Sequence, residues 1–258
     1  MKQLLIIGIG AGDPEYLTVQ AINAMNRADV FFLLDKGASK QPLLQLRRDI
    51  LQRYVTHDRY RLVEADSPER VREGDYAGQV HDLNRAKQQV FERLIERELQ
   101  DGQCGAFLVW GDPSLYDSTL RILDAIQNAG RLDFDYQVIP GITSVQALAA
   151  RHKVPLNAIG QSVQITTGRR LAEGFPANAD SVVVMLDAED TYRQLDDPEL
   201  EIYWGAYVGT ENEILRSGRL VEVGEDIQRT RREARQTHGW IMDTYCLLYT
   251  SPSPRDRG

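Results

Sequence analysis

The chain of 258 residues is long enough for one large domain or two ordinary ones, and its 42% hydrophobic and 26% charged residues are typical of a soluble globular protein. The formal net charge of −8 argues against a general binder of nucleic acid or of anionic membranes. Cys104 and Cys246 are too few for a disulfide framework or a zinc site, and Cys104 is interpreted as an inert core thiol. Neither a membrane-spanning run nor a signal peptide is recognised, so a cytoplasmic location is expected.

The first half of the chain is expected to alternate strands and helices. Its clearest unit is a continuous apolar run at residues 106–110, which ends at Gly111-Asp112-Pro113 and is followed by a helix that Asp117 or Ser118 can cap. The expected strands cover residues 3–7, 30–34, 60–63, 106–110 and 134–139, and the expected helices begin near Thr18, 42, 82, 118 and 145. This alternation predicts a mostly parallel sheet whose carboxyl-end loops gather at one edge, where open α/β sheets bind ligands.

Two segments of this half carry further expectations. On the helix at residues 42–54, Leu43, Leu46 and Ile50 are expected to face inward, and Arg47 and Arg48 outward. Residues 66–79 are polar and without periodicity, which favours a loop that covers a cleft.

The loop after the first strand is rich in glycine. Gly8, Gly10 and Gly12 resemble a dinucleotide fingerprint, but the third glycine comes one residue too early and Asp13-Pro14 follows it. A dinucleotide site is therefore rejected, while the glycines still require a tight turn or a close backbone approach.

The second half is predicted to form a smaller, mixed α/β domain. We expect a first domain at residues 1–150, a second at 151–248 and a disordered or non-native tail at 249–258. Strands are expected at residues 163–167, 181–186, 202–208, near 220 and 240–248, with helices or loops near 170–175, 189–195 and 210–216. The charged segment 226–236 has few apolar positions and is interpreted as a surface helix.

The sequence shows no obvious acid–base machinery. The four histidines lie far apart without metal-ligand spacing, so no metal is expected. Asp187, Glu189 and Asp190 form an acidic cluster, which is interpreted as a solvated loop. This pattern favours a reaction in which the cofactor carries the reactive group and the protein positions it.

Three loops carry a resemblance to a known family. The motifs at residues 8–18, 110–116 and 138–144 appear in the order and spacing of the tetrapyrrole methylases, and the similarity continues into the second half of the chain. It implies a two-domain α/β fold with the active site in the cleft between the domains. It also implies S-adenosyl-L-methionine as methyl donor.

Within the family, the chain resembles a branch of aerobic cobalamin biosynthesis that methylates precorrin-5. Residues 30–37, 105–123, 166–170, 203–207 and 238–245 carry this closer match. The resemblance implies methylation of precorrin-5 at C-1 and release of the C-20 acetyl group as acetate. The carbon nucleophile belongs to the macrocycle, so the enzyme needs alignment and water exclusion more than a base. No residue identifies itself as the activator of the water that deacetylation requires.

The resemblance also assigns the donor-binding positions, which come from both halves of the chain. These expected contacts are Trp110, Gly111, Asp112, Leu115, Thr143, Ser144, Met185, Leu186, Ala206, Tyr207 and Met242. Trp110 departs from the glycine that is common at its position in relatives.

The first glycine loop is expected nearer the tetrapyrrole. Substrate contacts are expected at Gly10, Ala11, Asp13, Lys36, Arg169 and Arg170, where Ala11 replaces a proline common in relatives. The three cations could pair with substrate carboxylates or could be solvated surface charges. Asp13 and Asp112 could equally serve structure, by accepting backbone N–H groups in their turns.

Other readings remain open at this stage. A different precorrin methylase, or a diphthine-synthase-like enzyme that methylates a protein side chain, would share the fold. A non-catalytic module that binds S-adenosylmethionine is an alternative from another class. Members of the family commonly pair, so a homodimer is expected, without nucleic-acid or membrane partners.

Overall fold

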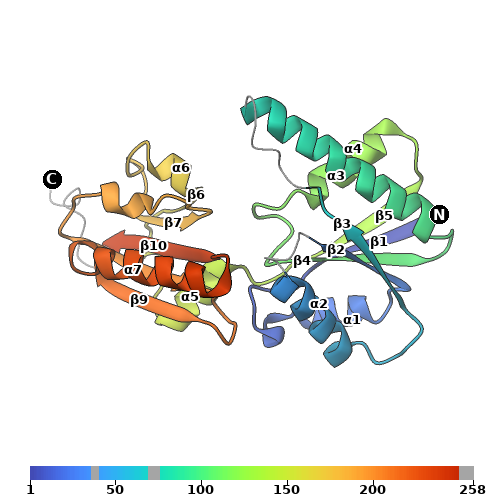
Figure 1. Ribbon diagram of the computed structural model, residues 1–258, viewed down its shortest axis with the longest axis horizontal. Helices are drawn as coiled ribbons and strands as arrows, with labels where there is room; N and C mark the ends of the chain where they lie inside the picture. The colour runs from blue at the N-terminus through green and yellow to red at the C-terminus, as the bar shows by residue number, and fades with distance from the viewer. Residues whose placement is uncertain (36–40, 69–75, 250–258) are drawn as a thin grey trace. The chain divides into compact units, whose positions relative to one another are not determined.

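The computed structural model describes residues 1–35, 41–68 and 76–249. The chain divides into two compact units, one covering Met1–Thr143 and the other beginning at Ser144. Each unit contains one five-stranded sheet with helices packed against it (Figure 1). The α/β class with one parallel and one mixed sheet is therefore confirmed.

The first sheet is parallel throughout, in the order β3-β2-β4-β1-β5. Its strands are β1 (Lys2–Gly8), β2 (Val30–Asp35), β3 (Arg61–Asp66), β4 (Cys104–Val109) and β5 (Phe134–Ile139). The central strands are buried on both faces, as the continuous apolar runs predict.

Helices cover both faces of this sheet (Figure 1). They are η1 (Pro14–Tyr16), α1 (Val19–Met25), α2 (Gln41–Tyr54), α3 (Tyr76–Glu98) and α4 (Thr119–Ala129). Helices α3 and α4 pack on one face and α1 and α2 on the other. The Thr18 side chain caps α1 by accepting the Ala21 N–H at 3.0 Å, while Asp117, rather than Ser118, accepts the first N–H of α4.

The second sheet is mixed, in the order β6-β7-β10-β8-β9. Its elements are α5 (Ser144–His152), β6 (Val163–Thr167), α6 (Gly168–Leu171), β7 (Ser181–Met185), η3 (Thr191–Gln194), β8 (Leu200–Ala206), β9 (Ile214–Arg219), α7 (Leu220–His238) and β10 (Asp243–Tyr249). Strands β6 and β7 run parallel, and β10 pairs antiparallel with both β7 and β8.

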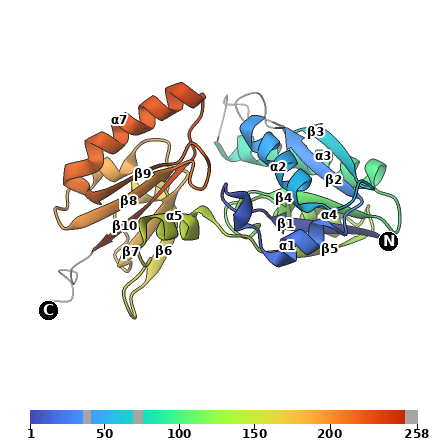
Figure 2. The same cartoon turned by 90° about the horizontal axis from the view of Figure 1, so that it is seen from below.

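Helices α5 and α7 cover opposite faces of this second sheet (Figure 2). Alternate residues of β8 explain the arrangement, because Trp204 packs with α7 whereas a Cβ on its neighbour Gly205 would meet Leu148 of α5 at 2.8 Å. Helix α5 was expected in the domain at residues 1–150, but it packs on β8 and β10. The division therefore falls at Thr143.

Two expectations for the second half are wrong in detail. Residues 214–219 form strand β9, and the helix begins directly at Leu220. Helix α7 is longer than the expected surface helix, and it buries Ile227, Arg231 and Ala234 against the sheet. Its apolar stripe is thin because a buried arginine occupies part of the face.

Candidate functional site

Three loops meet at the carboxyl edge of the first sheet, as the parallel order predicts. The loop after β1 pairs with the loop after β4, where the Gly10 N–H donates to the Gly111 carbonyl at 3.2 Å and the Gly111 N–H donates back at 2.8 Å. The loop after β5 joins them, because the Gly141 N–H donates to a carboxylate oxygen of Asp112 at 2.8 Å. The three motifs therefore form one connected structure.

Glycine is required where these loops approach one another. A Cβ on Gly8 would lie 2.6 Å from the Gly141 nitrogen, and a Cβ on Gly141 would overlap the Gly111 carbonyl oxygen. Both clashes are with backbone, which cannot rotate away as a side chain can. Only glycine permits this packing of three loops.

Asp112 fixes two of the loops at once. One carboxylate oxygen accepts the Ser114 N–H at 2.8 Å, and the other accepts the Gly141 N–H. Partial burial acts to raise the pKa of Asp112, but the hydrogen bonds from Ser114 and Gly141 outweigh it and lower the pKa below its ordinary value. Asp13 likewise accepts the Glu15 N–H at 2.8 Å. The structural role considered for both aspartates is confirmed.

The register of the second sheet brings the other expected donor contacts to a single edge. Met185 at the end of β7 lies opposite Thr244 of β10, and Ala206 at the end of β8 lies opposite Asp243. Met242 precedes β10, and its carbonyl accepts the Tyr207 N–H at 2.8 Å. The edge thus gathers Met185, Leu186, Ala206, Tyr207 and Met242 within one unit.

Two residues of this edge have left-handed backbone conformations. Leu186 has φ 55° and Tyr207 has φ 49°, which are unfavourable for large side chains. The Leu186 side chain is 67% exposed, whereas the Tyr207 ring is buried and its hydroxyl donates to the Trp240 carbonyl. An exposed leucine on a strained turn at a strand end is available for an apolar ligand surface.

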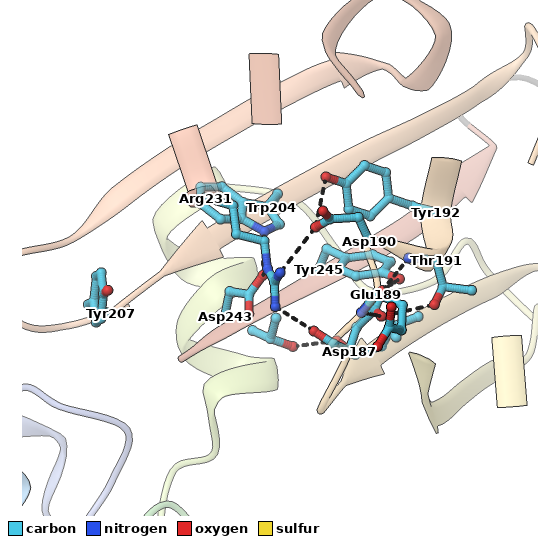
Figure 3. A network of polar contacts seen from close by, with 12 residues as sticks. Asp187, Glu189, Asp190, Thr191, Tyr192, Trp204, Tyr207, Arg231, Asp243 and Tyr245 are labelled. Atoms are coloured by element: carbon cyan, nitrogen blue, oxygen red, sulfur yellow. Dashed lines mark hydrogen bonds and ion pairs between the residues drawn. The ribbon is translucent and has the colours of Figure 1, made fainter. Parts of the chain in front are cut away.

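A buried polar network supports the turn after Leu186 (Figure 3). The Asp187 carboxylate accepts the Tyr245 hydroxyl at 2.6 Å, the Thr191 N–H at 2.8 Å and the Glu189 N–H at 3.0 Å. Burial, together with Asp187, raises the pKa of the Tyr245 phenol, so it remains a donor. Gly168 leaves room for this carboxylate, because a Cβ there would lie 2.5 Å from Asp187 Cγ.

Arg231 of α7 completes the network. Its Nη2 donates to the Asp187 carbonyl and its Nε to Asp243 at 2.9 Å, while Nη1 pairs with Asp190 at 3.3 Å (Figure 3). Burial acts to lower the pKa of Arg231, but Asp243 and then Asp190 raise it above its ordinary value. The interpretation of the acidic cluster as a solvated loop is therefore wrong for Asp187 and Asp190. Glu189 alone is exposed.

The expected substrate residues differ in what the structure describes. Gly10 and Ala11 are buried in the interlocked loops. Arg169 and Arg170 are exposed on α6, which follows β6 at the same edge as Met185, and Arg170 pairs with Glu173. Lys36 lies outside the described residues.

Arg47 is a residue that the sequence analysis misplaced. It was expected to face solvent, but its Nε donates to the Leu108 carbonyl at 3.1 Å, and its Nη1 donates to Leu43. Its guanidinium lies at the end of β4, directly before Trp110. Helical periodicity alone could not show this, because the position borders the apolar stripe of α2.

Within residues 1–35, 41–68 and 76–249, no group of three His, Cys, Asp or Glu side chains is arranged to hold a metal ion. In the same part of the chain, no helix is long and apolar enough to cross a membrane.

Comparison with known proteins defines the class. Residues 3–224 match the tetrapyrrole (corrin/porphyrin) methylases, and the chain belongs to this family. A precorrin-6A synthase [deacetylating] from a Sinorhizobium species is 54% identical over 248 residues, which cover 96% of this chain and 95% of the relative. The predicted family is thereby confirmed.

Solved structures agree with this assignment. A cobalamin synthesis related protein (CobF) from Corynebacterium diphtheriae superposes with a TM-score of 0.83 and 38% identity, covering 97% of this chain and 100% of the other. A uroporphyrin-III C-methyl transferase from Thermus thermophilus, complexed with S-adenyl homocysteine, has a TM-score of 0.57 and 18% identity, covering 95% and 97% of the chains. The latter likeness shows the fold alone.

Proposed function

We propose that the chain is an S-adenosylmethionine-dependent C-methyltransferase of aerobic cobalamin biosynthesis. It methylates precorrin-5 at C-1 and releases the C-20 acetyl group as acetate, which gives precorrin-6A. The observation that carries this proposal is the 54% identity, over 96% of the chain, to a precorrin-6A synthase [deacetylating].

The donor, when bound, supplies an electrophilic methyl group on a sulfonium, which a carbon of the reduced macrocycle attacks in line. The residues of both edges fit such a molecule. On the second edge, the exposed Leu186 and the partly buried Met185 and Met242 offer apolar contact for an adenine ring, beside the buried Ala206. On the first edge, the small backbone profile of Gly111 allows a close approach.

Each edge has a defined task in this proposal. The donor is contacted from the first edge by Trp110, Gly111, Asp112, Leu115, Thr143 and Ser144. From the second edge it is contacted by Met185, Leu186, Ala206, Tyr207 and Met242. The tetrapyrrole is contacted by Gly10, Ala11, Asp13, Lys36, Arg169 and Arg170. The two exposed arginines on α6 suit its carboxylates.

Acetate release is a second chemical step, which is separate from methyl transfer and consumes one water molecule. Water adds to the acetyl carbonyl, the bond from that carbon to C-20 breaks, and its electron pair returns to the macrocycle. We assign no residue to the activation of this water. We further propose that the enzyme works in the cytoplasm as a homodimer, as the family resemblance suggests.

The test is turnover with defined products. Purified protein is incubated with precorrin-5 and methyl-labelled S-adenosylmethionine, and the tetrapyrrole and acetate are analysed by mass spectrometry. One added methyl with stoichiometric acetate is expected. Tight binding of S-adenosylhomocysteine without either product would instead favour another precorrin methylase, a diphthine-synthase-like enzyme or a non-catalytic module.

A further inference from the structure

A pocket in the first unit lies beside Trp110, outside the residues assigned above to the substrate. It opens at the ends of β2 and β4 and is bordered by α2, α3 and the start of α4. Its floor is apolar and includes the stacked rings of Phe91 and Phe107, whose centroids are 4.5 Å apart. Two cations, Arg47 and Lys87, line it.

Arg47 is a partly buried cation without an ion-pair partner in the described part of the chain. Two of its nitrogens donate to the backbone carbonyls of Leu108 and Leu43, at 3.1 and 2.9 Å, and Nη2 has no acceptor among the described residues. Burial lowers the pKa of Arg47 to about 10, and the charge of Asp117 offsets this only in part. Withdrawing a cation from water without an ion-pair partner is costly, which favours an anionic ligand beside Arg47.

Other polar groups of the pocket are donors of the kind an anion requires. Lys87 and Trp110 line it, and neither the Lys87 ammonium nor the Trp110 indole N–H has a hydrogen-bond or ion-pair partner among residues 1–35, 41–68 and 76–249. Ser118 lines it as well, and its hydroxyl does not cap α4. Asp117 is the one carboxylate among the described lining residues, and it already accepts the Thr119 N–H at 2.7 Å. The two cations, Arg47 and Lys87, and the carboxylate of Asp117 leave a net charge of +1 in the pocket, which one carboxylate of a ligand would balance.

We propose that this pocket binds one carboxylate-bearing side chain of the tetrapyrrole, with its methylene groups against the aromatic floor and its carboxylate between Arg47 and Lys87. The proposal rests on the proposed function, which supplies a substrate with acetate and propionate arms. It adds a specificity site at the end of β4, directly adjoining the Trp110–Leu115 loop assigned to the donor.

A purely structural role for Arg47 explains only part of the pocket. Its two hydrogen bonds to backbone carbonyls tie α2 to β4, and a scaffold residue would need nothing more. Such a role does not account for Lys87, Trp110 and Ser118, which line the same pocket and carry donor groups of their own. Lys87 is therefore the position at which ligand binding can be tested without breaking the anchor.

The first test measures carboxylate binding directly and is independent of turnover. Propionate is titrated into the ¹⁵N-labelled protein, and the Trp110 indole resonance is followed, with the Trp204 and Trp240 indoles as internal references. A saturable shift is expected in the wild type and in Arg93→Gln, an exposed cation on the same helix α3. In Lys87→Gln the affinity for propionate, measured from this shift, should fall about tenfold, and the neutral propionamide should produce no shift. No shift with propionate, or the same shift with propionamide, would overturn the proposal.

The second test connects the pocket to the substrate. In Lys87→Gln the KM for precorrin-5 should rise about tenfold. In Lys87→Glu it should rise further, because a negative charge replaces the cation, and in both variants the KM for the donor should stay unchanged. Arg93→Gln and Arg93→Glu should match the wild type. Propionate binding with an unaltered KM for precorrin-5 would overturn the assignment to the substrate. A wild type that binds propionate but does not convert precorrin-5 would contradict the proposed function and the pocket's assignment to that substrate, while the carboxylate pocket itself stands.

Discussion

The two sheets form the edges that carry the candidate site residues by different physical means. At the first edge, loops after β1, β4 and β5 pack backbone against backbone, and Gly8 and Gly141 allow the approach. At the second edge, side-chain charges shape the turn, since Arg231 joins Asp187, Asp190 and Asp243 under the end of β7. One edge depends on the absence of side chains, and the other on buried, matched charges.

This difference predicts different responses to mutation. A backbone-packed edge has no flexible part that can absorb an added methyl group, so small substitutions should disrupt it completely. A charge network can retain part of its hydrogen bonding when one member is replaced by a similar group, so graded effects are expected.

The largest effect is expected for Gly141→Ala. The added Cβ would overlap the Gly111 carbonyl oxygen and lie 2.9 Å from Gly8 Cα, so the free energy of unfolding should fall by about 4 kcal/mol or more. Chemical denaturation followed by circular dichroism measures the change. Gly224→Ala is the matched control, because its Cβ would make an ordinary 3.7 Å contact with Leu220 inside α7. In that control the free energy of unfolding should rise by about 0.5–1 kcal/mol. Equal losses of stability in both variants would refute the packing argument.

The next largest effect is expected for Arg231→Met. Removing the cation leaves Asp243 and the partly buried Asp190 without their counterion and the Asp187 carbonyl without its donor. The free energy of unfolding should fall by about 3 kcal/mol. Arg231→Lys should lose less, because it keeps the charge but not the fork of donors. Calorimetry of unfolding and titration with S-adenosylhomocysteine report stability and donor affinity.

The exposed neighbour Arg232 provides the control for this network. Arg232→Met should leave both stability and donor affinity unchanged, since the side chain faces solvent on the same helix. If Arg231→Met bound S-adenosylhomocysteine as tightly as Arg232→Met, the support of the Leu186 turn by the network would be refuted.

Asp112→Ala should have a smaller effect, of about 1–2 kcal/mol, because it removes the acceptor for the Ser114 and Gly141 N–H groups. Since the folded-state pKa of Asp112 is lowered below its ordinary 3.8, its contribution is present above pH 3.8 and is lost as the pH falls further. Asp124→Ala, at an exposed position on α4, should not change stability or its acid dependence. Identical acid unfolding curves for the two variants would contradict this assignment.

The smallest effect concerns His152 of α5. Burial lowers its pKa below the ordinary 6.5, although the Trp204 carbonyl and Glu213 oppose this. The unfolded chain therefore takes up the proton first as the pH falls, so stability present above pH 6.5 should decline toward the lower folded-state pKa. Unfolding measured at pH 7.5 and pH 5.5 should show a smaller decline in His152→Asn than in the wild type. An unchanged pH dependence in that variant would show that His152 is not the group responsible.

The backbone-built edge could be predicted from the sequence, and the charge-built edge could not. Glycines and prolines at fixed offsets after apolar runs signal tight loops, which identified the residues at 8–18, 110–116 and 138–144. By contrast, Asp187 and Arg231 are separated by 44 positions, and they meet only because α7 packs against the second sheet and η3. Judged from its neighbours in the sequence alone, each of these residues is predicted to be a solvated surface charge. The donor contacts of the second edge came from family resemblance alone.

The most direct test of the account is whether both edges hold one methyl donor. Hydrogen–deuterium exchange is measured with and without S-adenosylhomocysteine. The account predicts slower exchange in peptides covering residues 110–115 and 143–144 of the first edge, and 185–186, 206–207 and 242 of the second. Protection confined to one edge, or located elsewhere in the chain, would contradict it.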